Sequence, residues 1–338
     1  MKFSPVMDSY WRFAHERQQV YFKRLQDPIG PWTNDPIIGQ YRFTNAYRAA
    51  DRVSQYLIRH VQYNDARSQS VEELFFRTLL FKIFNKIETW ESLERIVGPL
   101  SWASTSLEKI SNALDRMMAG GQPVYSAAYI MPAPKLGSVR KHANHIALLK
   151  MMMEEGLPAR VAKARSLREV FDLLVPYPGL GRFLAFQYAI DLNYSSMLDF
   201  DESTFVVAGP GALDGIAKCF LDTGGLSAED IIYEVTDSQA GAFARLGLHF
   251  AGLGARPLQP IDCQNLFCEI SKYARVAHPE VAGVSGRTRI KQHYRASLRA
   301  PGPPFFPPRW KIELPAAGDS MRLSTQLSLA LSLNNLSA

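Results

Sequence analysis

Three acidic residues stand within four positions of one another, Asp199, Asp201 and Glu202. A carboxylate can stabilise the positive charge that develops on a sugar when an N-glycosidic bond breaks, and it can orient or deprotonate an attacking nucleophile. The alternative role for such residues is to cap the segment that follows them. The cluster is therefore a candidate catalytic centre, and the sequence around it must supply the elements that position it.

The turn closest to this cluster reads Pro178-Gly179-Leu180-Gly181 and separates two segments of helical periodicity. Glycines permit a tight turn, and the first amides of the second helix can hold a phosphate. The segment at 166–193 resembles the helix–hairpin–helix of DNA repair glycosylases. The resemblance implies that Gly179, Gly181 and Arg182 bind the DNA backbone. An ordinary helical hairpin with a glycine cap is the alternative.

In glycosylases of this kind a catalytic aspartate follows the second hairpin glycine by about twenty residues. That spacing leads to Asp201, with Glu202 as its nearest rival and Asp199 as a further alternative. Bifunctional members carry a Schiff-base lysine two residues after the same glycine, where this chain has Phe183. The resemblance therefore implies a monofunctional enzyme without lyase activity.

Basic residues are concentrated near the C-terminal end. Nine lysines and arginines lie between Ser271 and Lys311, opposed by the single acid Glu280. Such a surplus is typical of a surface that contacts phosphates, although a solvated basic face is the alternative. The residues that we expect to contact DNA are Lys272, Arg275, Arg289 and Lys291.

Two further segments are rich in polar side chains, at 42–55 and 261–275. At helical spacing, Asn45, Arg48, Arg52 and Gln55 share one face of the first. Amide and acidic side chains of this kind can read the edge of a base, so both segments predict a base pocket; solvated, ion-paired faces are the alternative. The pocket candidates are Asn45, Arg48, Gln264, Asn265 and Glu269. We expect no metal, since the spacing of Cys263 and Cys268 does not suit zinc, and no cofactor.

The composition indicates a folded and mostly helical protein. Of 338 residues, 47% are hydrophobic and 21% are charged, which excludes disorder over most of the chain. There is no apolar run that could span a membrane and no signal peptide, and three cysteines suit a reducing cytosol. We expect an N-terminal helix at 1–35, a helical glycosylase-like core at 36–300, a Pro-rich strap at 301–312 and a tail at 313–338.

Five motifs together resemble one family more closely than they resemble glycosylases in general. They are residues 41–48 (YRFTNAYR), 80–85 (LFKIFN), 187–194 (QYAIDLNY), 209–212 (GPGA) and 262–269 (DCQNLFCE). They are similar to the helical, glycosylase-like proteins of DNA base hypermodification. That group includes the helical domain of 5-hydroxymethyluracil DNA kinases and the putrescinyl- or glutamyl-thymine pyrophosphorylases. The resemblance covers about residues 36–295 and implies an all-α helix–hairpin–helix fold.

This resemblance leaves three functions open. The 338 residues contain no P-loop motif, so we do not expect phosphorylation of hydroxymethyluracil. The first interpretation is a glycosylase that excises a modified base from double-stranded phage DNA, without an obligate protein partner. The second is a transferase that attaches an amine or amino acid to activated 5-hydroxymethyluracil. The third is a non-catalytic binder of modified DNA. The spacing of Asp201 and the absence of the lysine favour the first.

Overall fold

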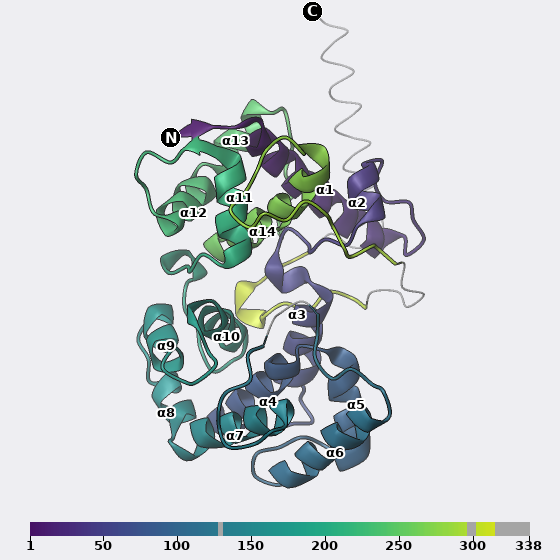
Figure 1. Ribbon diagram of the computed structural model, residues 1–338, viewed down its shortest axis with the longest axis vertical. Helices are drawn as coiled ribbons and strands as arrows, with labels where there is room; N and C mark the ends of the chain where they lie inside the picture. The colour runs from purple at the N-terminus through teal and green to yellow at the C-terminus, as the bar shows by residue number, and fades with distance from the viewer. Residues whose placement is uncertain (128–130, 296–301, 315–338) are drawn as a thin grey trace, which may run out of the picture.

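The computed structural model describes residues 1–127, 131–295 and 302–314 of the chain (Figure 1). Within these residues the chain forms fourteen α-helices and one pair of short strands. The prediction of a mostly helical fold is confirmed. The helices form an upper and a lower group in Figure 1, with α3 (Arg52–Tyr56) and the yellow C-terminal segment between them.

The upper group combines the first two helices of the chain with the last four. It contains α1 (Pro5–Gln26), α2 (Pro36–Gln40), α11 (Pro210–Cys219), α12 (Ala228–Asp237), α13 (Gln239–Arg245) and α14 (Pro260–Ala277). The α1 helix packs against α11 and α14. Strand β1 (Lys2–Phe3) pairs antiparallel with β2 (Phe220–Asp222), so the N-terminus is joined to the segment that follows α11.

The lower group surrounds one almost fully buried helix, α4 (Val71–Phe84). The other helices of the group are α5 (Ile87–Val97), α6 (Leu107–Ala119), α7 (Lys141–Glu154), α8 (Leu157–Ala162), α9 (Leu167–Leu174) and α10 (Arg182–Tyr194). Of these, α5, α7, α8 and α10 pack against α4. The apolar run at 71–88 predicts a buried core helix, and the structure agrees. The helix ends at Phe84 because Asn85 adopts a left-handed conformation with φ of 48°.

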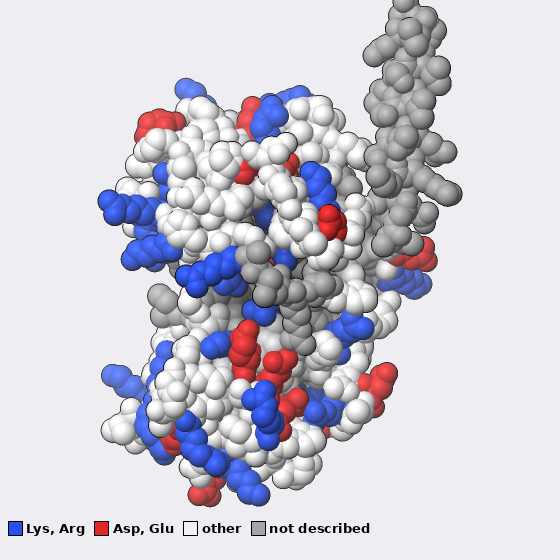
Figure 2. Space-filling view, turned by 90° about the vertical axis from the view of Figure 1, so that its right-hand side faces the viewer, with Lys and Arg blue, Asp and Glu red and all other residues white. Residues whose placement is uncertain are grey.

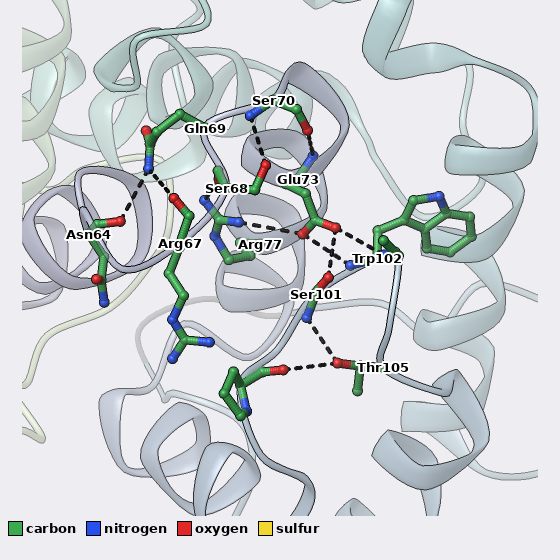
Figure 3. A network of polar contacts seen from close by, with 12 residues as sticks. Asn64, Arg67, Ser68, Gln69, Ser70, Glu73, Arg77, Ser101, Trp102 and Thr105 are labelled. Carbon is green, nitrogen blue, oxygen red and sulfur yellow. Dashed lines mark hydrogen bonds and ion pairs between the residues drawn. The ribbon is translucent and has the colours of Figure 1, made fainter.

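A buried acid joins α4 to the loop that precedes α6 (Figure 3). The Glu73 carboxylate accepts hydrogen bonds from Ser101 Oγ at 2.8 Å and from the amides of Trp102 and Ala103 at 3.1 and 2.9 Å. Arg77 lies 3.4 Å from the same carboxylate. These contacts satisfy a charge that would be costly to bury alone, so they fix the course of this loop.

The periodicity of residues 43–62 predicts a helix, but this segment does not form one continuous helix. It forms the 3₁₀ turn η1 (Arg48–Ala50), then α3, then the π-helical segment η2 (Leu57–Gln62). The Asn45 side chain donates to the Ala50 carbonyl, and Asp51 accepts from the Asn45 amide. Because these local bonds compete with helical ones, the polar residues of this segment do not share one face. The sequence at 124–130 has some strand character, but no strand forms at 124–127, and 128–130 lie outside the described residues.

Glycines allow α11 and α14 to pack with their backbones close together. A Cβ added to Gly215 would lie 1.9 Å from the Phe267 carbonyl oxygen, and one on Gly211 would lie 2.3 Å from Cys268 Sγ. A Cβ on Gly209 would lie 2.5 Å from the Phe183 ring. The Gly-Pro-Gly sequence before α11 predicts either a phosphate cradle or a tight turn, and close packing accounts for its glycines.

We expect Gly215→Ala to lower the free energy of unfolding by several kcal/mol, because the new methyl group meets backbone that cannot easily move. Gly241 in α13 is the matched control, since a Cβ there meets nothing within 4 Å. Gly241→Ala should raise stability by about 0.5–1 kcal/mol through helix propensity. Urea unfolding of both variants checks this. Equal stabilities would contradict the packing of α11 on α14.

Candidate functional site

Arg48 lies buried where the two helix groups meet. Its Nη1 is 2.8 Å from Asp191 Oδ1 and its Nε donates to Gln187 Oε1 at 3.0 Å, so it is held by α10. Its backbone amide donates to Asp262 Oδ1 of α14 at 2.8 Å. Burial raises the pKa of Asp262 to about 7. Through its side chain and its backbone amide, Arg48 thus connects η1, the lower group and the upper group.

Asp191 receives a second buried cation from α4. Lys82 Nζ lies 3.0 Å from Asp191 Oδ2 and 2.9 Å from Asn85 Oδ1. Burial alone would raise the pKa of Asp191, but Arg48 and Lys82 hold it below its usual value. Burial lowers the pKa of Lys82 despite the attraction of Asp191. The cluster of Arg48, Lys82 and Asp191 is therefore two cations around one carboxylate.

Glu202 is the buried member of the acidic cluster. It lies in the 3₁₀ turn η3 (Glu202–Thr204), is 3% exposed, and pairs with Arg256 at 2.8 Å. Asn193 Nδ2 lies 3.5 Å from the same carboxylate. Burial raises the pKa of Glu202 in spite of Arg256, Arg48 and Arg309. This carboxylate can therefore take up a proton more readily than an exposed glutamate.

The two neighbouring acids have different surroundings. Asp201 is exposed, and its side chain accepts from the Ser203 amide at 2.8 Å, which caps η3. Asp199 is 82% exposed at its side chain and pairs with Arg309 at 2.8 Å. The contacts thus favour Glu202 over Asp201 as a residue that acts from within the junction.

The structure places the expected base-pocket residues in two separate groups. Arg48 and Gln264 lie at the junction, where Gln187 Nε2 donates to Gln264 Oε1 at 3.5 Å. Asn45 accepts from Arg17 at 3.0 Å, and Glu269 accepts from the Thr44 amide at 3.0 Å. Asn265 is half-buried on the same helix as Gln264 and Glu269.

Sequence reasoning assigned no role to Lys82, Gln187, Asp191 or Arg256. Gln187 and Asp191 lie four residues apart in the otherwise buried helix α10, and that spacing on an apolar helix was the available signal. Lys82 and Arg256 had no such signal. A groove of about 350 Å³ opens beside Arg256, lined also by Tyr47, Phe243 and Phe250.

A turn joins α9 and α10, which pack together, at the place of the predicted helix–hairpin–helix; the helix–hairpin–helix itself stays a prediction. Gly179 has φ of +85°, which a residue with a side chain adopts at a cost, and Gly181 is the N-cap of α10 without a side-chain cap. Amides in the first turn of a helix have no acceptor within that helix. Arg182 is exposed and lies over the Phe171 ring. Phosphate binding here stays a prediction.

The predicted DNA-contacting cations lie along α14 and the loop after it. Lys272 pairs with Glu269 at 2.8 Å, and Arg275 donates to the Arg289 carbonyl at 3.2 Å. Arg289 and Lys291 are exposed. Lysine and arginine side chains gather along one edge of the upper group, just above the junction (Figure 2).

Asp214 of α11 binds both this basic loop and α14. Asp214 accepts from the Ser285 amide at 2.6 Å and from the Ser271 hydroxyl. Lys218 lies 3.6 Å from the same carboxylate. The loop is therefore fixed to the helix pair α11 and α14 rather than free in solution.

The described residues contain no group of three or more acidic, histidine or cysteine side chains that could hold a metal ion. Among the described residues, none of the helices has the length and apolar character needed to cross a membrane.

Comparison with known proteins decides the family. The family model described as "5-hmdU DNA kinase, helical domain" matches residues 4–283. The chain belongs to this family. The resemblance seen in the motifs is thereby confirmed.

The 5-hmdU DNA kinase of Bacillus phage SP10 is 29% identical over 286 residues, which is 79% of this chain and 45% of that protein. The chain thus spans about half the length of this curated relative. No solved structure matches it.

Proposed function

We propose that this member of the 5-hmdU DNA kinase helical-domain family acts in DNA base hypermodification. Its substrate is double-stranded DNA that carries activated 5-hydroxymethyluracil, to which it attaches an amine or amino acid. The observation that carries the proposal is the family match over residues 4–283. The relative's name describes a kinase for a modified nucleotide in DNA. Base excision, favoured from the spacing of Asp201, has no support from these comparisons.

The proposed step is a substitution at the methylene carbon of the base. The amine nitrogen forms a bond to this carbon, and the carbon–oxygen bond to pyrophosphate breaks. The electron pair of the broken bond leaves with pyrophosphate, and the amine proton passes to a carboxylate. A base close to the nucleophile accelerates such a step.

The junction provides groups for each part of this step. Glu202 is a buried carboxylate with a raised pKa, so we assign it the proton. Arg48, Lys82 and Arg256 supply positive charge that favours an anionic leaving group. The aromatic side chains of Tyr47, Phe243 and Phe250 line the groove beside Arg256, where a flipped base could stack.

The exposed cations after α14 supply contacts to DNA phosphates. We expect the double variant Arg289→Gln, Lys291→Gln to bind all DNA sequences more weakly and to reduce the slope of log K against log salt by about 2. Lys150→Gln is the control, because this exposed lysine pairs with Glu154 on α7 of the lower group. Fluorescence anisotropy at several salt concentrations measures both. An unchanged slope in the double variant would remove these residues from the DNA surface.

The transfer itself is tested by mass analysis of nucleosides. DNA that carries pyrophosphorylated 5-hydroxymethyluracil is incubated with the protein and an amine, then digested. A nucleoside heavier by the amine supports the proposal. A released free base indicates excision, and binding without any mass change indicates a non-catalytic binder.

A further inference from the structure

The described residues 302–314 contain nearly all of the Pro-rich strap expected at 301–312 and are called the strap from here on. They lie outside the residues that the family model matches. It is extended apart from the 3₁₀ turn η4 (Pro308–Trp310), as its prolines predict. In Figure 1 it passes between the upper and lower helix groups. The strap is therefore placed at the junction that holds the candidate site.

Arg309 of the strap binds the C-terminal end of α10. Its guanidinium donates to the carbonyls of Asn193, Tyr194 and Ser195, the last at 3.0 Å. Its Nε lies 2.8 Å from Asp199 Oδ1. A cation is favoured at the negative end of a helix. Arg309 thus fixes both the end of α10, which carries Asn193, and the start of the loop that leads to Glu202.

Trp310 holds the other partner of Glu202. The Arg256 guanidinium lies over the Trp310 ring, 3.9 Å from its centre, while it pairs with Glu202. Two other rings contact the Trp310 indole. Tyr194 lies edge-on at 5.6 Å between ring centres, and Phe306 lies at 6.3 Å. Stacking restricts a guanidinium to one plane, so Trp310 limits where Arg256 can reach.

The strap is also anchored on α3 and η2. Arg59 donates to the Pro303 carbonyl at 3.0 Å, and the Phe305 amide donates to Gln55 Oε1 at 2.8 Å. At its other end the strap lies close to Gly254. A Cβ added to Gly254 would lie 3.4 Å from the Glu313 carbonyl oxygen. Contacts on both sides of the junction favour a fixed wall of the site over a loose linker.

We propose that Arg309 and Trp310 are positioning residues that hold the Glu202–Arg256 pair in place. The inference rests on the proposed function for its chemistry, but the arrangement can be tested without it. The charged and titratable groups that act on Glu202 are Arg256, Arg48, Arg309, Asp262 and Tyr194, together with the amide of Asn193. Arg309 lowers the pKa of Glu202, so its loss should raise that pKa.

The test follows the Glu202 carboxyl by ¹³C NMR in protein labelled at glutamate, with the resonance assigned by Glu202→Gln. In Arg309→Gln we expect its titration midpoint to rise by roughly half a pH unit or more. Arg309→Lys keeps the charge and should return most of the shift. Trp310→Leu, which frees Arg256, should also raise the midpoint. Arg52→Gln is the control, because this exposed arginine pairs with Glu88 rather than with the strap and should leave the midpoint unchanged.

Turnover is measured on the same variants. In Arg309→Gln the acid limb of the pH–rate profile should move to higher pH, with kcat reduced and KM for DNA little changed. A Glu202 midpoint equal to that of the wild type in both Arg309→Gln and Trp310→Leu overturns the inference. If the wild type shows no transfer while the midpoint still rises, the positioning role stands and the proposed function fails.

Discussion

Replacing Asp191 with asparagine is expected to lower the free energy of unfolding by about 3–5 kcal/mol, because Arg48 and Lys82 stay buried without their carboxylate. The folded pKa of Asp191 lies below that of an unfolded aspartate. Its ionised form therefore stabilises the fold at neutral pH, and that contribution is lost as the pH falls through the folded pKa. The difference between wild type and variant should thus shrink in acid. Urea unfolding at pH 7 and at about pH 3, below the pKa of an unfolded aspartate, measures both effects.

The exposed pair Arg168–Asp172 offers a matched control for this prediction. Its side chains are 63% and 52% exposed, and Asp172→Asn removes the same charge from a helix surface. We expect a change of less than about 1 kcal/mol. In the double variant Lys82→Met, Asp191→Asn, part of the loss should be recovered, because one unpaired charge is removed with its partner. An Asp191→Asn protein as stable as Asp172→Asn would show that the junction is not held by these charges.

Replacing Glu202 with glutamine is expected to reduce the rate of transfer by about 10²–10⁴-fold, the usual contribution of a positioned general base. Binding of DNA should change little, since the exposed cations Arg289 and Lys291 lie in the loop after α14. Rates are measured under single-turnover conditions with DNA that carries the activated base.

The adjacent acid supplies the control for Glu202. Asp201 is exposed and caps η3, and asparagine caps as well as aspartate does. Asp201→Asn should therefore keep most of the activity. The opposite pattern, an active Glu202→Gln protein and an inactive Asp201→Asn protein, would return the catalytic role to the residue that glycosylase spacing selects.

The helical class, the buried helix α4 and the turn before α10 could be predicted from periodicity and turn residues, because these signals are local. The family could be identified from motifs that are each short. The broken course of 43–62 could not be predicted, since contacts of Asn45 and Asp51 decide it. Hydrophobic periodicity along the sequence carries no information about such side-chain contacts.

The candidate site shows the same division. Arg48 and Gln264 were predicted from polar residues in helical segments, and both lie at the junction. Arg256 could not be predicted, because it lies in a loop and gains its role only through contacts with Glu202 and Trp310. Both partners are distant in the sequence, since Glu202 stands 54 residues before Arg256 and Trp310 stands well after it. Spacing alone favoured Asp201 over Glu202, whereas burial, which depends on the tertiary fold, favours Glu202.

The most direct test of the central claim is a mass measurement on one defined DNA duplex. The duplex carries a single pyrophosphorylated 5-hydroxymethyluracil, and it is incubated with an amine and either the wild-type protein or Glu202→Gln. The account predicts a nucleoside that has lost pyrophosphate and gained the amine, formed with the wild type and formed far more slowly with the variant. A free base with alkali-labile sites in the duplex, or an unchanged nucleoside at saturating protein, would contradict it.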